Sequence, residues 1–291
     1  MLESQFRGLR FLIIKLSRWL WKTQAIWLRG SLCLALGIGA LYLDQRGRFD
    51  QRFTMRGPQP IDSSLIIIDI RSSDWESFNK TDRNLLRAMK EYASINERFF
   101  WNPESLEVLL KRILVGGPKA IGVTFFFPMV DDLSGSSKVF EDERIIWAAR
   151  LDSDDRALLP ITASNYGYNV GILNYPEDED GIYRRFTQPV SEIPHFVVRL
   201  SQVSSLDQPS QNYIIPGESR AINYRGGSST YPTYTLTNLL NGDLDQVLKD
   251  KVVIIGSRDL SSQLIDTPLG QMAAAEVLAN SIDSFLHDRW I

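Results

Sequence analysis

The sequence contains few of the side chains that most often perform catalysis or bind metals. Its 291 residues include one cysteine, Cys33, and two histidines, His195 and His287. A single cysteine excludes an intrachain disulfide and a cysteine-based metal site. Neither histidine lies in a GxSxG or HExxH motif, and the chain has no Walker loop and no GxGxxG fingerprint. We therefore expect no catalysis, no cofactor and no metal in this chain.

The net charge of −3 is unevenly divided along the chain. The first 29 residues carry one acidic side chain, Glu3, and six basic ones, namely Arg7, Arg10, Lys15, Arg18, Lys22 and Arg29. The remainder of the chain is acidic. This division predicts a basic N-terminal arm that contacts an anionic surface, and it argues against nucleic-acid binding by the main domain.

A long apolar stretch runs from Ala25 to Leu43 and is interrupted only by Arg29. As a helix these 19 residues would extend roughly 28 Å, close to the thickness of a bilayer core. Apolar residues before the stretch recur at helical spacing, with basic residues and tryptophans between them. We therefore predict a cytoplasmic basic amphipathic helix over residues 1–24 and a transmembrane helix over residues 25–43.

The excess of basic residues before the apolar stretch predicts its orientation. Basic residues favour the cytoplasmic side of a membrane, so residues 44–291 are expected on its extracytoplasmic side. A cleaved signal peptide is the alternative, since Gly37 and Gly39 offer small residues at a cleavage point. Ser31, Ala35 and Gly39 share one helix face, and such small-residue faces favour close packing of two helices. A homodimer is therefore expected.

Continuous apolar runs alternate with helical patterns after residue 44. Strands buried on both faces are predicted at Leu65–Ile70, Ala120–Phe127, Ala157–Ser164 and Lys251–Ser257. Helices are predicted at Leu85–Tyr92, Pro103–Val115, Val139–Arg150, Thr235–Leu240 and Ala273–His287. This alternation is typical of an α/β domain with a mostly parallel central sheet and flanking helices.

One region departs from that pattern. Residues 168–190 are interpreted as an antiparallel hairpin that turns at Asp180 and Gly181, and residues 221–226 as a further strand. The acidic EDEDG sequence in the hairpin is not an EF-hand, because Pro176 and Thr187 would occupy ligand positions that require acidic side chains.

Six segments, in this order, resemble the CHASE type-2 (CHASE2) domain family. They are RFDQRFTMRGPQPIDSSLIIIDI, GGPKAIGVTFFFP, EDEDGIYRR, AINYRG, KVVIIGS and DTPLG, followed by a final helix. The resemblance covers about residues 44–290. It implies an extracytoplasmic sensory domain of a bacterial membrane signalling protein, as found in cyanobacteria and other bacteria. The resemblance implies a cytoplasmic output that is a kinase or a cyclase. We therefore expect either that this chain ends before further transmembrane helices and an output domain, or that the output lies on a partner.

The sequence departs from the family pattern at three positions. Family members often carry aspartate where this chain has Arg71 and Thr124, and a histidine where it has Leu278. These departures affect any family ligand site that depends on those side chains.

Candidate ligand-binding residues follow from strand order. In a parallel α/β sheet the loops at the carboxyl ends of the strands surround a crevice, and ligands bind there. The candidates from these strand ends are Asp69, Arg71, Thr124, Ser164, Asn165, Gly256, Ser257, Asp266 and Thr267. Arg225 is a further candidate, because the glycines after it permit close backbone approach by a ligand. Structural alternatives remain open for each, since Asp69 could instead cap a helix or pair with an arginine, and Asp266 could stabilise the turn at Thr267 and Pro268.

The sequence therefore predicts a sensor that binds an unknown small solute or envelope component and passes a conformational change across the membrane. The final helix, with Leu278, Ile282 and Phe285 on one face, is expected to carry this change. An envelope adaptor domain without an output of its own is one alternative. A periplasmic hydrolase is another, and it would require a nucleophile and a base in one cleft.

Overall fold

The computed structural model describes residues 15, 26–71, 74, 103–125, 138–152, 154, 156–159, 169–205, 214–258 and 264–291. The chain divides into two units, Met1–Met55 and Arg56–Ile291. The second unit contains all the strands described below. The helix predicted at residues 85–92 lies outside the described residues.

Helix α2 (Ile26–Arg56) contains the apolar stretch and continues for 13 residues beyond the predicted end at Leu43. The first proline after the stretch is Pro58, and Gly57 before it adopts a positive φ of 68°, which is typical of a residue that ends a helix. No helix in the described part of the chain is both long enough and apolar enough to cross a membrane. The predicted transmembrane helix over residues 25–43 is therefore not found. Only 14 residues separate Arg29 from Asp44, and these would span about 21 Å as a helix.

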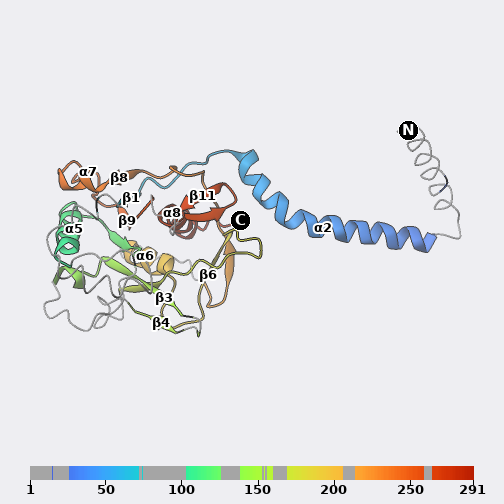
Figure 1. Cartoon of the computed structure of the whole chain (residues 1–291), viewed down its shortest axis with the longest axis horizontal. Coiled ribbons are helices and arrows are strands. Elements are labelled where there is room, and N and C mark those ends of the chain that lie inside the picture. Colours follow the sequence, from blue (N-terminus) through green and yellow to red (C-terminus); the bar gives the residue numbers. More distant parts are fainter. Residues whose placement is uncertain are drawn as a thin grey trace. The chain divides into compact units, whose positions relative to one another are not determined.

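The second unit is built around a seven-stranded sheet in the order β4-β3-β2-β9-β1-β8, with β5 also paired to β3 (Figure 1). Its strands are β1 (Leu65–Asp69), β2 (Ala120–Val123), β3 (Ile145–Leu151), β4 (Ala157–Leu158), β5 (Val170–Ile172), β8 (Thr233–Thr235) and β9 (Val252–Gly256). Every pairing is parallel except that of β3 with β4. The predicted α/β class with a mostly parallel sheet is confirmed.

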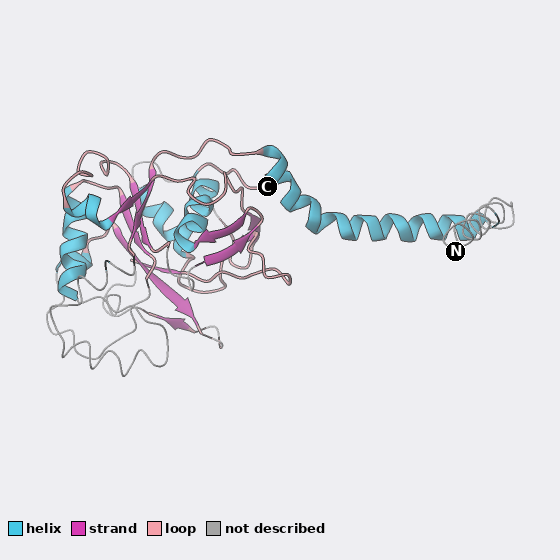
Figure 2. Ribbon diagram, turned by 45° about the horizontal axis from the view of Figure 1, so that its top comes forward, coloured by secondary structure: helices cyan, strands magenta, loops and turns pink. Residues whose placement is uncertain are grey.

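Helices cover both faces of this sheet (Figure 2). On one face α5 (Pro103–Val115) and α7 (Leu236–Leu240) form a buried cluster with Ile121, Val123 and Ile255. Alternate strand residues point to the opposite face, where a Cβ added at Gly122 would come within 3 Å of Phe196 and Leu200 of α6 (Phe196–Ser204).

Helix α8 (Ala274–Leu286) lies on the same face of the sheet as α6. Gly256 of β9, which approaches α8, points to the same face as Gly122, whereas Ile121 points to the other face. At Gly256 of β9 an added Cβ atom would come within 2.7 Å of Ala275 Cβ. Only glycine permits this close approach of helix to strand. The predicted helices at Pro103–Val115, Thr235–Leu240 and Ala273–His287 are confirmed within one residue.

The predicted hairpin over residues 168–190 is wrong in its pairing. Strand β5 joins the central sheet parallel to β3, whereas β6 (Arg185–Thr187) pairs antiparallel with β7 (Ser219–Ala221). The turn itself forms, since Gly181 N–H donates to the Asp178 carbonyl at 2.8 Å. A true antiparallel hairpin occurs later, between β10 (Leu264–Thr267) and β11 (Gly270–Ala273).

Three further element predictions need correction. Residues 139–150 were expected to be helical, but the structure has a short 3-10 helix, η3 (Lys138–Glu141), followed by β3, because Ile145, Ile146 and Trp147 form a buried strand run. The strand predicted at Ala157–Ser164 is limited to Ala157–Leu158 at the sheet edge, and residues 160–164 lie outside the described residues.

The strand predicted over residues 221–226 ends at Ala221. Beyond it, the backbone N–H groups of Asn223 and Arg225 donate to side chains of α8 and not to a neighbouring strand. The helix α6 was not predicted at all.

Candidate functional site

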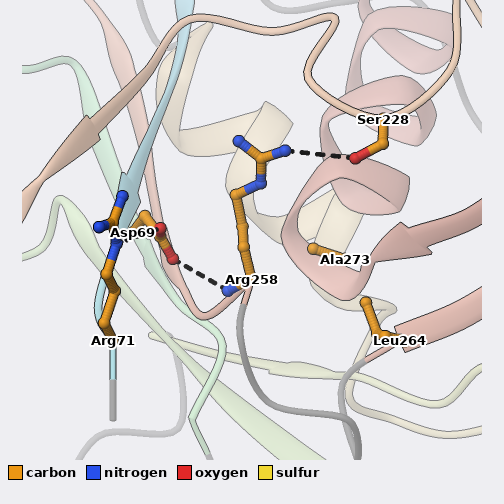
Figure 3. Close-up of a pocket in the computed structure, with 6 residues that line it drawn as sticks. All are labelled: Asp69, Arg71, Ser228, Arg258, Leu264 and Ala273. Atoms are coloured by element: carbon orange, nitrogen blue, oxygen red, sulfur yellow. Dashed lines mark hydrogen bonds and ion pairs between the residues drawn. The ribbon is translucent and has the colours of Figure 1, made fainter. Parts of the chain in front are cut away.

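A cavity of about 360 Å³ lies at the carboxyl ends of β1 and β9 (Figure 3). We call it the strand-end pocket. Its lining residues come from β1, from the segments after β1 and β9, from the loop before β8 and from the β10–β11 hairpin, and they are Asp69, Arg71, Ser228, Arg258, Leu264 and Ala273. The pocket therefore lies where ligands bind in parallel α/β sheets.

Asp69 connects the two arginines of the pocket. The parallel pairing of β1 with β9 aligns Asp69 with Gly256, so that the chain leaving β9 passes beside the carboxylate. The backbone N–H of Arg258 donates to Asp69 Oδ1 at 2.9 Å, and Arg71 Nε donates to Oδ2 at 3.3 Å. Figure 3 shows Asp69 between the two residues. The carboxylate is buried, at 4% exposure, and both of its oxygens help to position the pocket wall.

The two guanidinium groups differ in their surroundings. Arg71 is 54% exposed, and its Nη atoms have no hydrogen-bond acceptor among the residues that the structure describes. Arg258 Nη2 donates to Ser228 Oγ at 3.2 Å and to the Ser229 hydroxyl, and it lies 3.6 Å from a carboxylate oxygen of Glu276. Within the described residues, the Arg258 guanidinium therefore has three partners, whereas the more exposed Arg71 guanidinium has one.

Glu276, in the first turn of α8, is buried and supports the loop that carries Ser228. Its carboxylate accepts from Ser228 Oγ at 3.1 Å and from the Ser229 backbone N–H at 2.5 Å. The Glu276 carboxylate therefore stabilises the loop that contributes Ser228 to the pocket wall.

The remaining wall of the pocket is apolar and includes the start of α8. Leu264 is 39% exposed, and Ala273 is the N-cap residue of α8. Alanine has no side-chain acceptor with which to cap a helix, so the first backbone N–H groups of α8 are left with their partial positive charge. The wall thus combines a small apolar surface with a weakly positive helix end.

A second polar cluster lies further along α8 and is closed to solvent. We call Asn280, Asp283 and Ser284 the α8 polar face. Arg225 donates through Nη2 and Nε to Asp283 Oδ1 at 3.0 and 3.3 Å, and through its backbone N–H to Asn280 Oδ1 at 2.8 Å. Asp283 Oδ2 accepts from the Tyr231 hydroxyl at 3.2 Å. Burial, together with the Asp283 charge, raises the pKa of Tyr231 well above its usual value.

The structure brings two of the predicted site residues, Asp69 and Arg71, to the strand-end pocket. Thr124 instead donates its hydroxyl to the Ile255 carbonyl at 2.8 Å and continues the pairing of β2 with β9. Ser257 is fully buried and does not line the pocket, and Arg225 is paired with Asp283. Asn165 and Ser164 lie outside the described residues.

Asp266 lies on exposed positions of β10 and does not line the pocket. The turn after it depends on Thr267, whose hydroxyl donates to the Gly270 carbonyl at 2.6 Å and accepts the Leu269 N–H at 3.3 Å. A turn-stabilising carboxylate was the structural alternative for Asp266. In the structure, the side chain that makes these turn contacts is Thr267.

Sequence reasoning missed Arg258 and Ser228. Arg258 is the first charged residue after the buried strand β9, and this position in the sequence was a usable signal. Ser228 had no comparable signal, because it reaches the pocket only through the contact of its loop with Glu276.

Within the described residues, no group of three histidine, cysteine, aspartate or glutamate side chains could hold a metal ion. Comparison with known proteins gave one result. The family model described as CHASE2 domain matches residues 25–291, whereas no curated protein and no solved structure matches the chain.

Proposed function

The chain belongs to the CHASE2 domain family, whose members are extracytoplasmic sensory domains, and we propose that it senses a small molecule bound in the strand-end pocket. The observation that carries this proposal is the cavity at the carboxyl ends of β1 and β9, with Asp69, Arg71 and Arg258 at its wall. We assign no catalytic role to these residues, and we propose that the domain is an input module.

The route from the pocket into the rest of the domain is helix α8. Ala273 lines the pocket at the start of this helix, and Glu276 in its first turn contacts the pocket arginine Arg258. About two turns further along, Asp283 accepts the backbone N–H of Asp62 at 2.9 Å. A shift of α8 on ligand binding would therefore reach residues 57–64, which follow α2 in the chain.

Residues 56–64 are tied to the same region by other contacts. Arg56 Nη1 donates to Asn223 Oδ1 at 2.6 Å, and Gln59 N–H donates to the Arg225 carbonyl at 2.6 Å. A ligand can shift a conformational equilibrium only if it binds one state more tightly than the other. We propose that the two states differ in the placement of α8 against residues 56–64, which we call the α2-proximal segment.

Membrane contact through α2 is part of the proposal. Leu34, Leu36 and Ile38 are each more than half exposed in this helix, and Trp27 is 86% exposed. Exposed apolar residues in such number are typical of a surface that lipid or protein covers. We propose that α2 associates with the bacterial inner membrane and that the signal reaches a kinase or cyclase on its cytoplasmic side.

A homodimer through α2 is a further component. Ser31 and Ala35 are exposed, and in the described part of the chain nothing beyond the local helix backbone lies within 4 Å of a Cβ added at Gly39. Cys33, exposed on the same helix, permits a direct test. Oxidative crosslinking in membranes should give a disulfide-linked dimer, and recovery of monomer alone would remove this component.

Ligand binding itself can be tested by thermal denaturation of the full chain with butyrate, butylamine, glucose and adenosine as probes. A compound that binds only the folded state raises Tm. At least one probe should raise Tm of the wild type but not of Leu264→Trp, which fills the pocket. Leu158→Trp, at an exposed site on β4, is the matched control and should respond like the wild type. If no probe gives a response that depends on Leu264, the pocket is not a sensory site.

A further inference from the structure

The lining of the strand-end pocket also indicates what kind of molecule it binds. Resting on the proposed function above, we infer that the pocket binds a small monocarboxylate. Its carboxylate is held by Arg71 and Arg258, and its short apolar body lies against Leu264 and Ala273.

The guanidinium groups supply the specific contact. A guanidinium presents paired N–H donors that match the two oxygens of a carboxylate. Arg71 uses Nε for Asp69, which leaves both Nη atoms without an acceptor in the part of the chain that the structure describes. Arg258 uses Nη2 for the serine hydroxyls, and its Nε and Nη1 likewise have no acceptor among the described residues. Donors of both arginines therefore remain for a ligand.

The charge balance favours one negative charge on the ligand rather than two. Each guanidinium already has a carboxylate nearby, since Asp69 lies 3.3 Å from Arg71 and Glu276 lies 3.6 Å from Arg258. The excess positive charge at the pocket comes from the N-terminal end of α8, which is equivalent to roughly half a unit charge. A phosphate group carries about −1.5 to −2 at neutral pH and would be repelled by Asp69 and Glu276. A carboxylate with a single charge meets less repulsion.

The size and the apolar wall limit the rest of the molecule. A volume of 360 Å³ is at the low end of the about 300–1,000 Å³ of small-molecule sites. In Figure 3, Asp69 lies between Arg71 and Arg258, and Leu264 and Ala273 lie on the other side of Arg258, so an anion that contacts the Arg258 guanidinium can extend its chain toward them. A body of three or four carbons would cover this wall, whereas a single methyl group would not.

The test uses the full chain and isothermal titration with butyrate as the principal probe. Three comparators each change one property of butyrate. Acetate has a shorter apolar body, butylamine replaces the anion with a cation, and inorganic phosphate carries more negative charge. Butyrate should bind more tightly than acetate by about tenfold, from the additional buried methylene groups. Butylamine should give no heat of binding, and phosphate should bind more weakly than butyrate.

Variants separate the two arginines from general effects of charge. Arg71→Gln and Arg258→Gln should each weaken butyrate binding by about tenfold or more, because each removes a charge-assisted contact. Arg71→Gln is the cleaner variant, since its side chain is more than half exposed. Arg156→Gln changes an arginine that is 76% exposed at the far edge of the sheet, and its affinity for butyrate should equal that of the wild type.

The outcomes distinguish this inference from the proposed function. If butylamine or glucose binds in a way that Leu264→Trp abolishes while butyrate does not bind, the ligand class is wrong and the sensory pocket remains. If phosphate binds more tightly than butyrate, the monocarboxylate is likewise overturned. If butyrate binds equally to the wild type and to both arginine variants, the assigned contacts are wrong.

Discussion

Two arginine–carboxylate pairs on the same side of the sheet have opposite surroundings. Arg225 and Asp283 are buried, with side-chain exposures of 7% and 0%, and they share further hydrogen bonds with Asn280 and Tyr231. Arg71 and Asp69 also form an ion pair, but Arg71 is 54% exposed and borders a cavity. The first pair is enclosed within the domain, whereas the second leaves hydrogen-bonding capacity on a surface that a ligand can reach.

The comparison shows that residue type alone does not distinguish a binding site from a structural contact. Arg71 follows the strand predicted at Leu65–Ile70, Arg225 lies within the strand predicted over residues 221–226, and both were predicted as ligand residues. The surroundings separate them, because the buried Arg225 guanidinium donates two hydrogen bonds to Asp283 Oδ1, whereas in the part of the chain that the structure describes the half-exposed Arg71 guanidinium donates one, to Asp69 Oδ2.

The largest effect is expected from Asp283→Ala. This change leaves the Arg225 guanidinium buried without its carboxylate, and it removes the acceptor of the Tyr231 hydroxyl and of the Asp62 N–H. Breaking a buried ion pair in this way costs about 3–5 kcal/mol. Urea denaturation should show that loss in the free energy of unfolding.

Asp288→Ala is the matched control for that prediction. Asp288 also pairs with an arginine, Arg220, at 3.5 Å, but its side chain is 65% exposed. Its removal should change the free energy of unfolding by less than about 1 kcal/mol. Equal losses in the two variants would mean that burial does not distinguish the two kinds of pair.

An intermediate effect is expected from pH, through His195. This histidine is buried, and its Nδ1 accepts the Val197 N–H at 3.1 Å at the start of α6. Burial lowers its pKa to about 4. The unfolded chain takes up the proton near pH 6.5, so stability falls as pH decreases from about 6.5 to 4, by on the order of 3 kcal/mol.

His195→Asn isolates this contribution, because asparagine can still accept the Val197 N–H but does not titrate. Denaturation at pH 7, 5.5 and 4.5 should show a smaller loss of stability in the variant than in the wild type. Parallel losses in both proteins would assign the acid sensitivity to the carboxylates instead.

The smallest effect is expected from Arg71→Gln. Its ion pair with Asp69 is exposed on the arginine side, and such pairs contribute about 0–1 kcal/mol. The free energy of unfolding should therefore remain within about 1 kcal/mol of the wild-type value, even though butyrate binding is weakened. A loss as large as that of Asp283→Ala would place Arg71 among the structural residues and remove the contrast between the two pairs.

The sequence predicted the central strands well because their apolar runs are continuous. Leu65–Ile70 and Lys251–Ser257 match β1 and β9 within a residue, since a strand buried on both faces needs no periodic pattern to be recognised. The prediction failed where pairing depends on tertiary contacts. Strand β5 pairs with β3 and not with β6, and nothing within residues 168–190 specifies that choice.

The site residues show the same contrast between local sequence signals and tertiary contacts. Asp69 and Arg71 were predicted because they end a recognisable strand. Arg225 was also predicted, but the partner that closes it from solvent, Asp283, lies 58 residues away on α8. The distance along the chain explains why the sequence left a structural role open for Arg225 but could not identify its partner.

The apolar stretch near the N-terminus gave the clearest correction. A transmembrane helix was predicted from composition over residues 25–43, yet the helix that forms runs to Arg56 and includes charged residues throughout its second half. The apolar stretch ends before Asp44, but the helix does not, because aspartate, glutamine and arginine are compatible with a helix. The end of the apolar stretch therefore did not predict the end of the helix.

Hydrogen exchange of the full chain, with and without saturating butyrate, tests most directly whether pocket occupancy reaches the α2-proximal segment through α8. The backbone N–H groups of Gln59 and Asp62, which donate to the Arg225 carbonyl and to Asp283, report on that segment. The account predicts that butyrate changes exchange at these two amides as well as at the Arg258 amide beside Asp69. A change confined to the Arg258 amide, with Gln59 and Asp62 unaltered, would contradict it.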